Sequence, residues 1–318
     1  FNKYVGPTKE QLTDLAVTES GIKKIPHNTV VMSFKLSIGK LAITTDEVYS
    51  NEAIMAFIDK KVEQVSSDYL YYLFLSKDWI EGTNKAVMGI TLNKATLSKV
   101  KIKLHDFKEQ EQIVSVLDKA NKLIALRKQQ IEDLDSLIKS RIVEMFGDIL
   151  RSNYETKALS EIADIGSSKR IYANEYVEKG IPFYRSKEIR ELGEGEKPSV
   201  ELFITEKRYN EIKEKFGIPS QGDILVAAIG ATIGYMWVID TDKPFYYKDG
   251  NLILISNIKA GNSLFFQEVL KQLIDEYKKA GAAGSAQLAL TIEKIEKMRV
   301  PVPPFEDQNQ FATFVQQV

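Results

Sequence analysis

The sequence of this chain contains a long internal repeat, and the repeat limits the folds that the chain can adopt. Residues 101–113 read KIKLHDFKEQEQI and residues 299–311 read RVPVPPFEDQNQF, an offset of 299 − 101 = 198 positions. The same offset pairs Phe107 with Phe305, and Gln110 with Gln308. A long repeat of low identity predicts two copies of one domain, and not a solenoid of short units. Two diverged copies in one chain can recognise two different targets.

Length and composition agree with two globular domains. The 318 residues are enough for about two domains, and no stretch reaches the roughly 18 apolar residues of a membrane helix. The absence of cysteine removes disulfide and thiol chemistry, and we expect a soluble cytoplasmic protein without a membrane partner. The net charge is −1, so any surface that binds nucleic acid has to be a local one.

A single long helix is predicted between the two copies. The residues at alternating steps of four and three from Ile113 to Met145 follow the a/d pattern of a coiled coil, and they are apolar except for Arg127 and Arg141, which interrupt the pattern. Gly147 is a suitable end for this helix. With roughly 36 residues it would be about 54 Å long. The residues expected at this helix interface are Ile113, Leu117, Ala120, Ile124, Ile131, Leu134, Ile138 and Met145, together with Phe311 and Val315 of the second copy.

One helix cannot bury so narrow an apolar face, so the face needs a partner. Phe311 and Val315 repeat the start of the pattern, which favours a second long helix of the same protein, packed antiparallel against the first. The alternative is an intermolecular coiled coil. Relative to the second copy, the first copy lacks its opening part, and the second long helix is present only at its start, so the apolar face can also remain open.

The globular copies have the pattern of α+β domains built from short strands and helices. In the second copy, short apolar runs predict strands at 181–184, 223–228, 236–239 and 252–255, followed by a helix over 264–279. In the first copy, the corresponding strands are expected at 29–32 and 53–58, with a helix over Ser67–Ile80. Glycines separate these runs.

The sequence offers no convincing catalytic or metal site. There is no cysteine, and the two histidines, His27 and His105, have no supporting motif for zinc binding or for a Ser-His-Asp set. The segment Gly230–Gly234 lacks the Gly-Lys-Ser/Thr ending of a phosphate loop and is interpreted as a tight turn. We therefore expect a protein that is not an enzyme and that binds neither metal nor cofactor.

Basic and polar residues gather in a few loops, where they suit contacts to phosphates and base edges. Taken singly, such loops are more often ordinary solvated surface. Their occurrence on a duplicated scaffold, with differences between the copies, favours the reading of two different DNA half-sites. The candidate DNA-binding residues are Ser33, Lys35, Lys40, Lys85, Ser168, Lys169, Arg170, Tyr172, Arg185 and Lys187.

Several of these segments resemble the specificity subunit of type I restriction-modification systems. Residues 180–189, GIPFYRSKEI, resemble the Gly-Ile-Pro-x-x-Arg block of its target recognition domains. Residues 222–225, GDIL, followed by Gly230 and Ile233-Gly234, resemble the next block. Residues 301–308, PVPPFEDQ, resemble the junction between a recognition domain and a long helix, and residues 104–112 are a weaker second copy of it.

The resemblance implies two similar target recognition domains separated by a long coiled-coil-type helix. Residues 1–106 would be the C-terminal part of the first recognition domain, 107–150 the central spacer helix, 151–304 the second recognition domain and 305–318 the start of the distal helix. It also implies a non-catalytic subunit that reads a bipartite site in double-stranded DNA. Its partners would be methyltransferase (modification) subunits, which bind S-adenosylmethionine, and a restriction subunit, which uses ATP.

Two other functions remain open from the residues themselves. One is an adaptor that binds only proteins through its coiled-coil helix and does not recognise DNA. The other is a DNA-modifying enzyme whose catalytic half is absent from this chain. Salt dependence separates the first from a DNA reader, because contacts to phosphates weaken steeply as salt rises.

Overall fold

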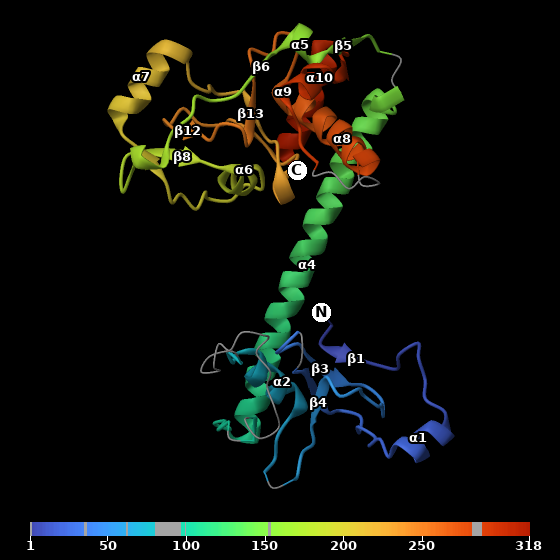
Figure 1. The fold of residues 1–318 in the computed structure, drawn as a ribbon. Helices are drawn as coiled ribbons and strands as arrows, with labels where there is room; N and C mark the ends of the chain where they lie inside the picture. The colour runs from blue at the N-terminus through green and yellow to red at the C-terminus, as the bar shows by residue number, and fades with distance from the viewer. Residues whose placement is uncertain are drawn as a thin grey trace. The chain divides into compact units, whose positions relative to one another are not determined.

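The computed structural model describes residues 2–34, 37–61, 63–79, 97–98, 100–151, 154–281 and 288–318. The chain forms two compact units, Phe1–Gln130 (unit 1) and Ile131–Val318 (unit 2). Each unit combines short strands with helices, as Figure 1 shows, so the predicted α+β class is confirmed. None of the described helices has the length and apolarity needed to cross a membrane.

A four-stranded sheet in the order β1-β3-β2-β4 lies at the centre of unit 1. Strand β1 runs parallel to β3, whereas β2 is antiparallel to both β3 and β4. The alternate residues Val30 and Met32 of β2 are buried together with Phe74 of helix α2, because neighbouring side chains of a strand face opposite sides. The strands are β1 (Tyr4–Val5), β2 (Val30–Ser33), β3 (Leu41–Thr44) and β4 (Ile54–Phe57).

Helix α2 (Ser67–Leu75) is shorter than the sequence predicted. The prediction extended it to Ile80, but the Phe74 carbonyl oxygen accepts hydrogen bonds from the Lys77 amide (3.2 Å) and from the Trp79 ring nitrogen (2.9 Å). These contacts satisfy a carbonyl that would otherwise continue the helix. Helix α1 (Asp14–Ser20) begins after the cap residue Thr13, and none of its residues is buried.

The described residues of unit 2 form three sheets. The first has the order β11-β10-β13-β6, the second β12-β8-β9-β7, and the third pairs β14 with β5. The strands are β5 (Thr156–Ala158), β6 (Asp164–Gly166), β7 (Tyr176–Val177), β8 (Ile181–Tyr184), β9 (Phe203–Ile204), β10 (Ile224–Ala227), β11 (Met236–Val238), β12 (Tyr246–Tyr247), β13 (Leu252–Ser256) and β14 (Arg299–Pro301).

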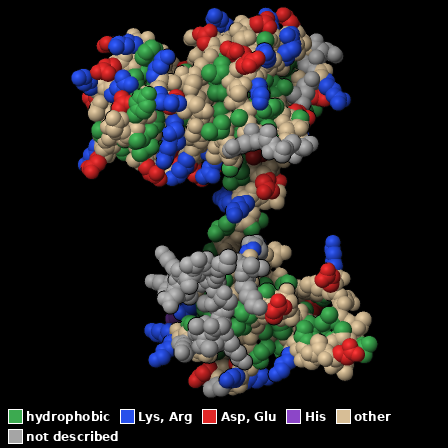
Figure 2. Space-filling view, viewed as in Figure 1, with side chains coloured by type: hydrophobic (Ala, Val, Ile, Leu, Met, Phe, Trp, Pro, Cys, Tyr) green, Lys and Arg blue, Asp and Glu red, His purple; other side chains and the backbone are tan. Residues whose placement is uncertain are grey.

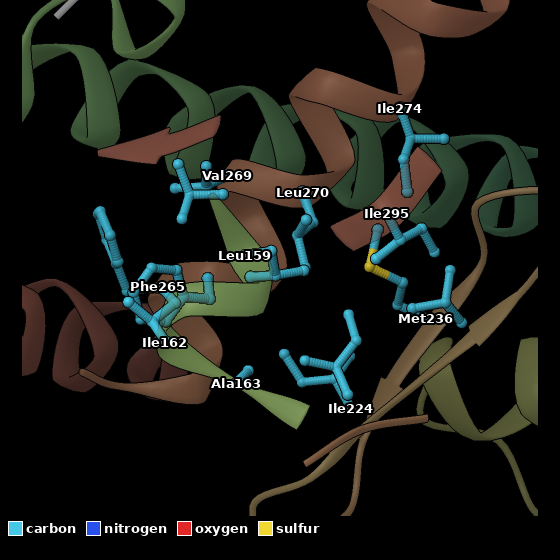
Figure 3. Packing of buried hydrophobic residues seen from close by; sticks show 14 of the residues in the cluster. Leu159, Ile162, Ala163, Ile224, Met236, Phe265, Val269, Leu270, Ile274 and Ile295 are labelled. Atoms are coloured by element: carbon cyan, nitrogen blue, oxygen red, sulfur yellow. The ribbon is translucent and has the colours of Figure 1, made fainter. Parts of the chain in front are cut away.

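Strand β10 lies between two hydrophobic cores of unit 2. Ile224 and Val226 belong to one core, and Leu225 and Ala227 belong to the other. The first core receives helix α8, and Figure 3 shows its residues Phe265, Val269, Leu270 and Ile274 in the same cluster as Ile224 and Leu159. The second core is rich in aromatic side chains and lies under the loops that carry most of the predicted DNA-binding residues.

The helices of unit 2 cover these sheets at several places. They are α5 (Leu159–Ile162), α6 (Ser186–Gly193), α7 (Glu206–Phe216), α8 (Ser263–Gly281), α9 (Ile292–Glu296) and α10 (Phe305–Gln317), with 3₁₀ turns η1 (Ile149–Arg151), η2 (Ala173–Glu175) and η3 (Gly230–Thr232). The expected turn at Gly230–Gly234 contains η3, with positive φ at Gly230 and Gly234. A left-handed φ of this kind favours glycine.

Helix α4 (Phe107–Phe146) is one uninterrupted helix of 40 residues, about 60 Å long at 1.5 Å per residue. Asp106 precedes the first turn, and its carboxylate accepts a hydrogen bond from the Glu109 amide (2.8 Å). Gly147 follows the last residue; it has φ +73° and donates its amide to the Val143 carbonyl. The predicted long helix and its glycine stop are both present.

The heptad pattern missed the two most deeply buried residues at the C-terminal end of α4. The pattern includes Met145, which is half-buried and packs against the core of unit 2, but it omits Ile142 and Phe146, which are buried in that core. A straight helix has 3.6 residues per turn, so an apolar face with a 3.5-residue period drifts around it. This end of α4 packs on a globular core instead of a single partner helix.

The repeat is confirmed by a glutamine clamp that occurs once in each unit. We use this name for Gln110 or Gln308 with its three backbone partners. In unit 1, Gln110 accepts a hydrogen bond from the Ser66 amide (2.9 Å) and donates to the carbonyls of Gln64 and His105. In unit 2, Gln308 accepts from the Asn262 amide (3.0 Å) and donates to the carbonyls of Ala260 and Pro303. The first clamp thus joins the first turn of α4 to the segment before α2, and the second joins the first turn of α10 to the segment before α8.

Candidate nucleic-acid interface

Parallel strands β8 and β12 bring several predicted DNA-binding residues to one edge of unit 2. Tyr246 pairs with Phe183, and the Lys248 amide donates to the Tyr184 carbonyl (2.9 Å). Parallel strands end at the same edge, so Arg185 and Asp249, which follow the two strands, emerge there together. We call this place the β8–β12 edge; the two strands and α6 lie close together in Figure 1.

The loop before η2 reaches the same edge. Arg170 donates from Nε to Asp249 (2.8 Å), and the Ser167 hydroxyl accepts a hydrogen bond from the Gly250 amide (3.3 Å). Arg170 is largely exposed, so its remaining guanidinium donors face solvent. The structure therefore brings Arg170 and Arg185 to one edge although they come from separate segments. Asp249 was not predicted, because nothing in the sequence relates it to Arg170.

Arg185 is the most constrained of the predicted residues. Glu188 accepts hydrogen bonds from its backbone amide (2.7 Å), Nε (3.3 Å) and Nη2 (2.8 Å). Glu201 accepts a further hydrogen bond from Nη2 (2.9 Å). These carboxylates raise the pKa of Arg185, so its guanidinium stays charged. The sequence analysis missed both glutamates, although a glutamate three residues after a cap position is a known helix-start signal.

Lys187 joins the same group of charges. Its Nζ donates to Glu201 (3.1 Å), so one exposed carboxylate joins two predicted DNA-binding cations. Hydrogen bonds from Arg185 and then from Lys187 hold the pKa of Glu201 below its ordinary value. Figure 2 shows that Lys and Arg side chains alternate with Asp and Glu over the visible face of unit 2. This distribution agrees with the net charge of −1.

Ser168, Lys169 and Tyr172 lie in the loop that contains Arg170. The Lys169 amide donates to the Tyr246 hydroxyl (2.7 Å), and its ammonium lies 4.5 Å from the ring centroid of Phe216. Ser168 and Lys169 line a cavity of about 490 Å³ beside Phe216. Tyr172 is exposed and offers an aromatic ring to solvent. The aromatic partner Phe216, at the end of α7, was not predicted.

Of the four DNA-binding residues predicted in unit 1, two lie in the described part of the chain. Ser33 and Lys40 lie together at the hairpin between β2 and β3, where the Ser33 hydroxyl accepts a hydrogen bond from the Lys40 amide (3.2 Å). Lys35 and Lys85 lie outside the described residues. In the second copy, the corresponding hairpin contains the apolar turn Gly230–Gly234, so the two copies differ at this position.

The predicted helix interface is divided into a packed part and an exposed part. Within unit 2, Ile138, Met145, Phe311 and Val315 all pack in the core. Phe146 lies 5.9 Å from Phe311 and the Arg141 guanidinium lies 5.6 Å from the Phe314 ring, so α10 runs antiparallel to this end of α4. Of the other predicted positions, Ile113 and Leu134 are half-buried, whereas Leu117, Ala120, Ile124 and Ile131 are exposed.

The described residues contain no group of three or more His, Asp or Glu side chains that could hold a metal ion. His105 is engaged with a neighbour, because its Nδ1 lies 2.6 Å from the Tyr69 hydroxyl and the two rings pack edge to face. His27 lies in the loop before β2. The β8–β12 edge described above therefore carries the cations Arg170, Arg185 and Lys187, each of which is paired with a carboxylate of the chain.

Comparison with known proteins identifies the family. A family model for the type I restriction modification DNA specificity domain matches residues 2–136 and 151–318, and the chain belongs to this family. A protein of Haemophilus influenzae assigned as a type I restriction enzyme specificity subunit is 26% identical over 264 residues. That alignment covers 80% of this chain but 64% of the relative, so the chain spans less than two thirds of its length.

A second relative and two solved structures agree with this assignment. The specificity subunit of the type I restriction enzyme MjaIX of Methanocaldococcus jannaschii is 24% identical, with 98% of this chain and 76% of the relative covered. The crystal structure of a type I restriction-modification S subunit from M. genitalium superposes with a TM-score of 0.59 over 99% of this chain and 81% of its own, at 17% identity.

The other structure comes from work on complex assembly and conformational transition of a type I restriction-modification system. It has a TM-score of 0.51 and 17% identity, and it covers 93% of this chain and 75% of its own. At these identities the likeness establishes the fold alone.

Proposed function

We propose that the protein is a non-catalytic DNA-recognition subunit that reads a bipartite site in double-stranded DNA, one half by each unit. The observation that carries this proposal is the glutamine clamp of Gln110 and Gln308, which shows two copies of one scaffold, combined with loops that differ between the copies. Equal scaffolds with unequal loops are what two different half-sites require. The cations at the β8–β12 edge supply contacts to phosphates and base edges.

The family and its named relatives support a set of partners. We infer that the protein directs type I methyltransferase subunits and a restriction subunit to the DNA site. S-adenosylmethionine and ATP would bind to those partners, and this chain would hold no cofactor of its own. We expect it to act in the cytoplasm, where duplex DNA is present and where a chain without cysteine needs no oxidising compartment.

Fluorescence anisotropy with the cognate methyltransferase and a library of random duplexes tests this function. We expect sequence preference and an affinity that falls steeply as salt rises. Lys169→Ala should weaken binding, and it should reduce base discrimination only if Lys169 reaches a base edge. The absence of any preference across the library would refute DNA recognition and leave the protein-binding adaptor as the better description.

A further inference from the structure

The two carboxylates that hold Arg185 differ sharply in exposure. The Glu188 side chain is 0% exposed, whereas the Glu201 side chain is 58% exposed. Both lie within hydrogen-bond distance of the same nitrogen, Nη2 of Arg185. The two acceptors carry equal charge, but Glu201 is the one that a ligand can reach from solvent.

Glu188 has the geometry of a positioning residue. It lies in the first turn of α6 and accepts hydrogen bonds from the Arg185 amide, Nε and Nη2, so it holds both the backbone and one side of the guanidinium. The Arg185 side chain is 29% exposed but Glu188 is buried, so separating the two would leave a buried carboxylate without its cation, which is strongly unfavourable. A ligand that arrives from solvent therefore leaves this contact in place, and the guanidinium keeps its direction.

Glu201 has the geometry of an exchangeable acceptor. It lies in the loop between α6 and β9, and its two oxygens contact different cations, Arg185 Nη2 (2.9 Å) and Lys187 Nζ (3.1 Å). Ion pairs with this much exposure contribute little free energy and are screened by salt. A DNA phosphate also presents two charged oxygens, so it can accept from the same two donors at little cost.

We propose that Glu201 occupies a phosphate position in the unbound protein and leaves Arg185 and Lys187 when DNA binds, while Glu188 keeps Arg185 in place. This inference rests on the proposed function, because it describes how the β8–β12 edge exchanges a protein carboxylate for a DNA phosphate. Because it competes with phosphate, Glu201 would lower the affinity of the protein for any duplex. The fixed guanidinium of Arg185 would accept a phosphate only from a duplex bound in a limited set of orientations.

The test is Glu201→Gln in the full chain, measured in complex with the cognate methyltransferase by anisotropy with a labelled random-sequence duplex over a salt series. Removal of the competing charge should tighten binding about two- to fivefold at low salt, and the gain should shrink as salt rises. The matched control is Glu293→Gln, which removes a glutamate of α9 that is 72% exposed and paired with Lys297. It should bind like the wild type. Thermal unfolding of both variants verifies that the fold is unchanged.

A second background distinguishes competition for Arg185 from a general effect of removing one negative charge. In the double variant Arg185→Gln/Glu188→Gln, which removes the Arg185–Glu188 pair, Glu201→Gln should raise the DNA affinity less than it does in the wild-type background. Unchanged or weaker binding by the Glu201 variant, or an equal gain in the Glu293 control, would overturn the exchange while DNA recognition stands. If the wild-type complex with the methyltransferase shows no salt-dependent binding to duplex DNA, the exchange and the proposed function both fail.

Discussion

The glutamine clamp of unit 2 allows a quantitative test of what holds the distal helix to its recognition domain. Gln308 is fully buried, and Gln308→Ala removes three hydrogen bonds at once. The Pro303 residue is buried, whereas Ala260 and Asn262 are half-buried and can regain water. With about 1 kcal/mol for each lost hydrogen bond and more for a carbonyl left buried, the free energy of unfolding of unit 2 should fall by about 2–4 kcal/mol.

The two tryptophans make the assay specific to each unit, because Trp79 lies in unit 1 and Trp237 in unit 2. Urea unfolding of Gln308→Ala in a Trp79→Phe background reports on unit 2, and the same change in a Trp237→Phe background should leave the unit 1 transition unchanged. Gln310→Ala is the matched control, because Gln310 is exposed on the same helix. A loss no larger than that of the control would refute the assignment of the clamp as a stabilising contact.

Three further predictions follow from other contacts. Gly261→Ala would place a Cβ 1.8 Å from Gln308 Oε1, so it should destabilise unit 2. In urea unfolding its effect on the free energy of unfolding should not add to that of Gln308→Ala, and simple additivity would contradict the shared contact. Lys3→Met removes ion pairs of 2.7 Å with Asp68 and Asp118 and should cost unit 1 about 1 kcal/mol by Trp79 fluorescence. Although desolvation raises the pKa of Asp118, hydrogen bonds from Lys3 and Tyr72 outweigh it and hold that pKa below 3.8. The stability that Lys3 contributes through Asp118 is therefore present above pH 3.8 and is lost as pH falls through the lower pKa of the folded state. A stability difference between Lys3→Met and the wild type that persists in strong acid would contradict this. Ile124→Glu and Ile131→Glu alter exposed positions of α4, so each should change the free energy of unfolding by less than about 0.5 kcal/mol. Both should abolish binding to a helical or methyltransferase partner in calorimetry, and retained binding would remove these residues from the interface.

Much of the scaffold could be predicted because it depends on local pattern. The heptad spacing and Gly147 predicted α4, and runs of β-branched and apolar residues predicted β10 and β13. The polar helix α7 was not predicted, since it buries only Tyr209 and Ile212 and gives a weak periodic signal. Its cap Thr205, whose hydroxyl accepts from the Arg208 amide, was the available clue.

The candidate site was harder to predict because its contacts join distant segments. The cations Arg170 and Arg185 stand out in the sequence, but their acceptors Asp249 and Glu201 lie 79 and 16 residues away. Such pairs depend on strand order and loop paths, which hydrophobic periodicity does not encode. The burial of Ile142 and Phe146 at the end of α4 was missed for a related reason, because a heptad pattern assumes one partner helix, whereas these residues pack in the core of unit 2.

The central claim is that two copies of one scaffold read two different halves of a DNA site. The most direct test compares the methylomes of cells with and without this gene. The account predicts that one methylated motif disappears with the gene, and that the motif consists of two unlike specific halves on either side of an unspecified spacer. An unchanged methylome, or the loss of a single contiguous motif, would contradict it.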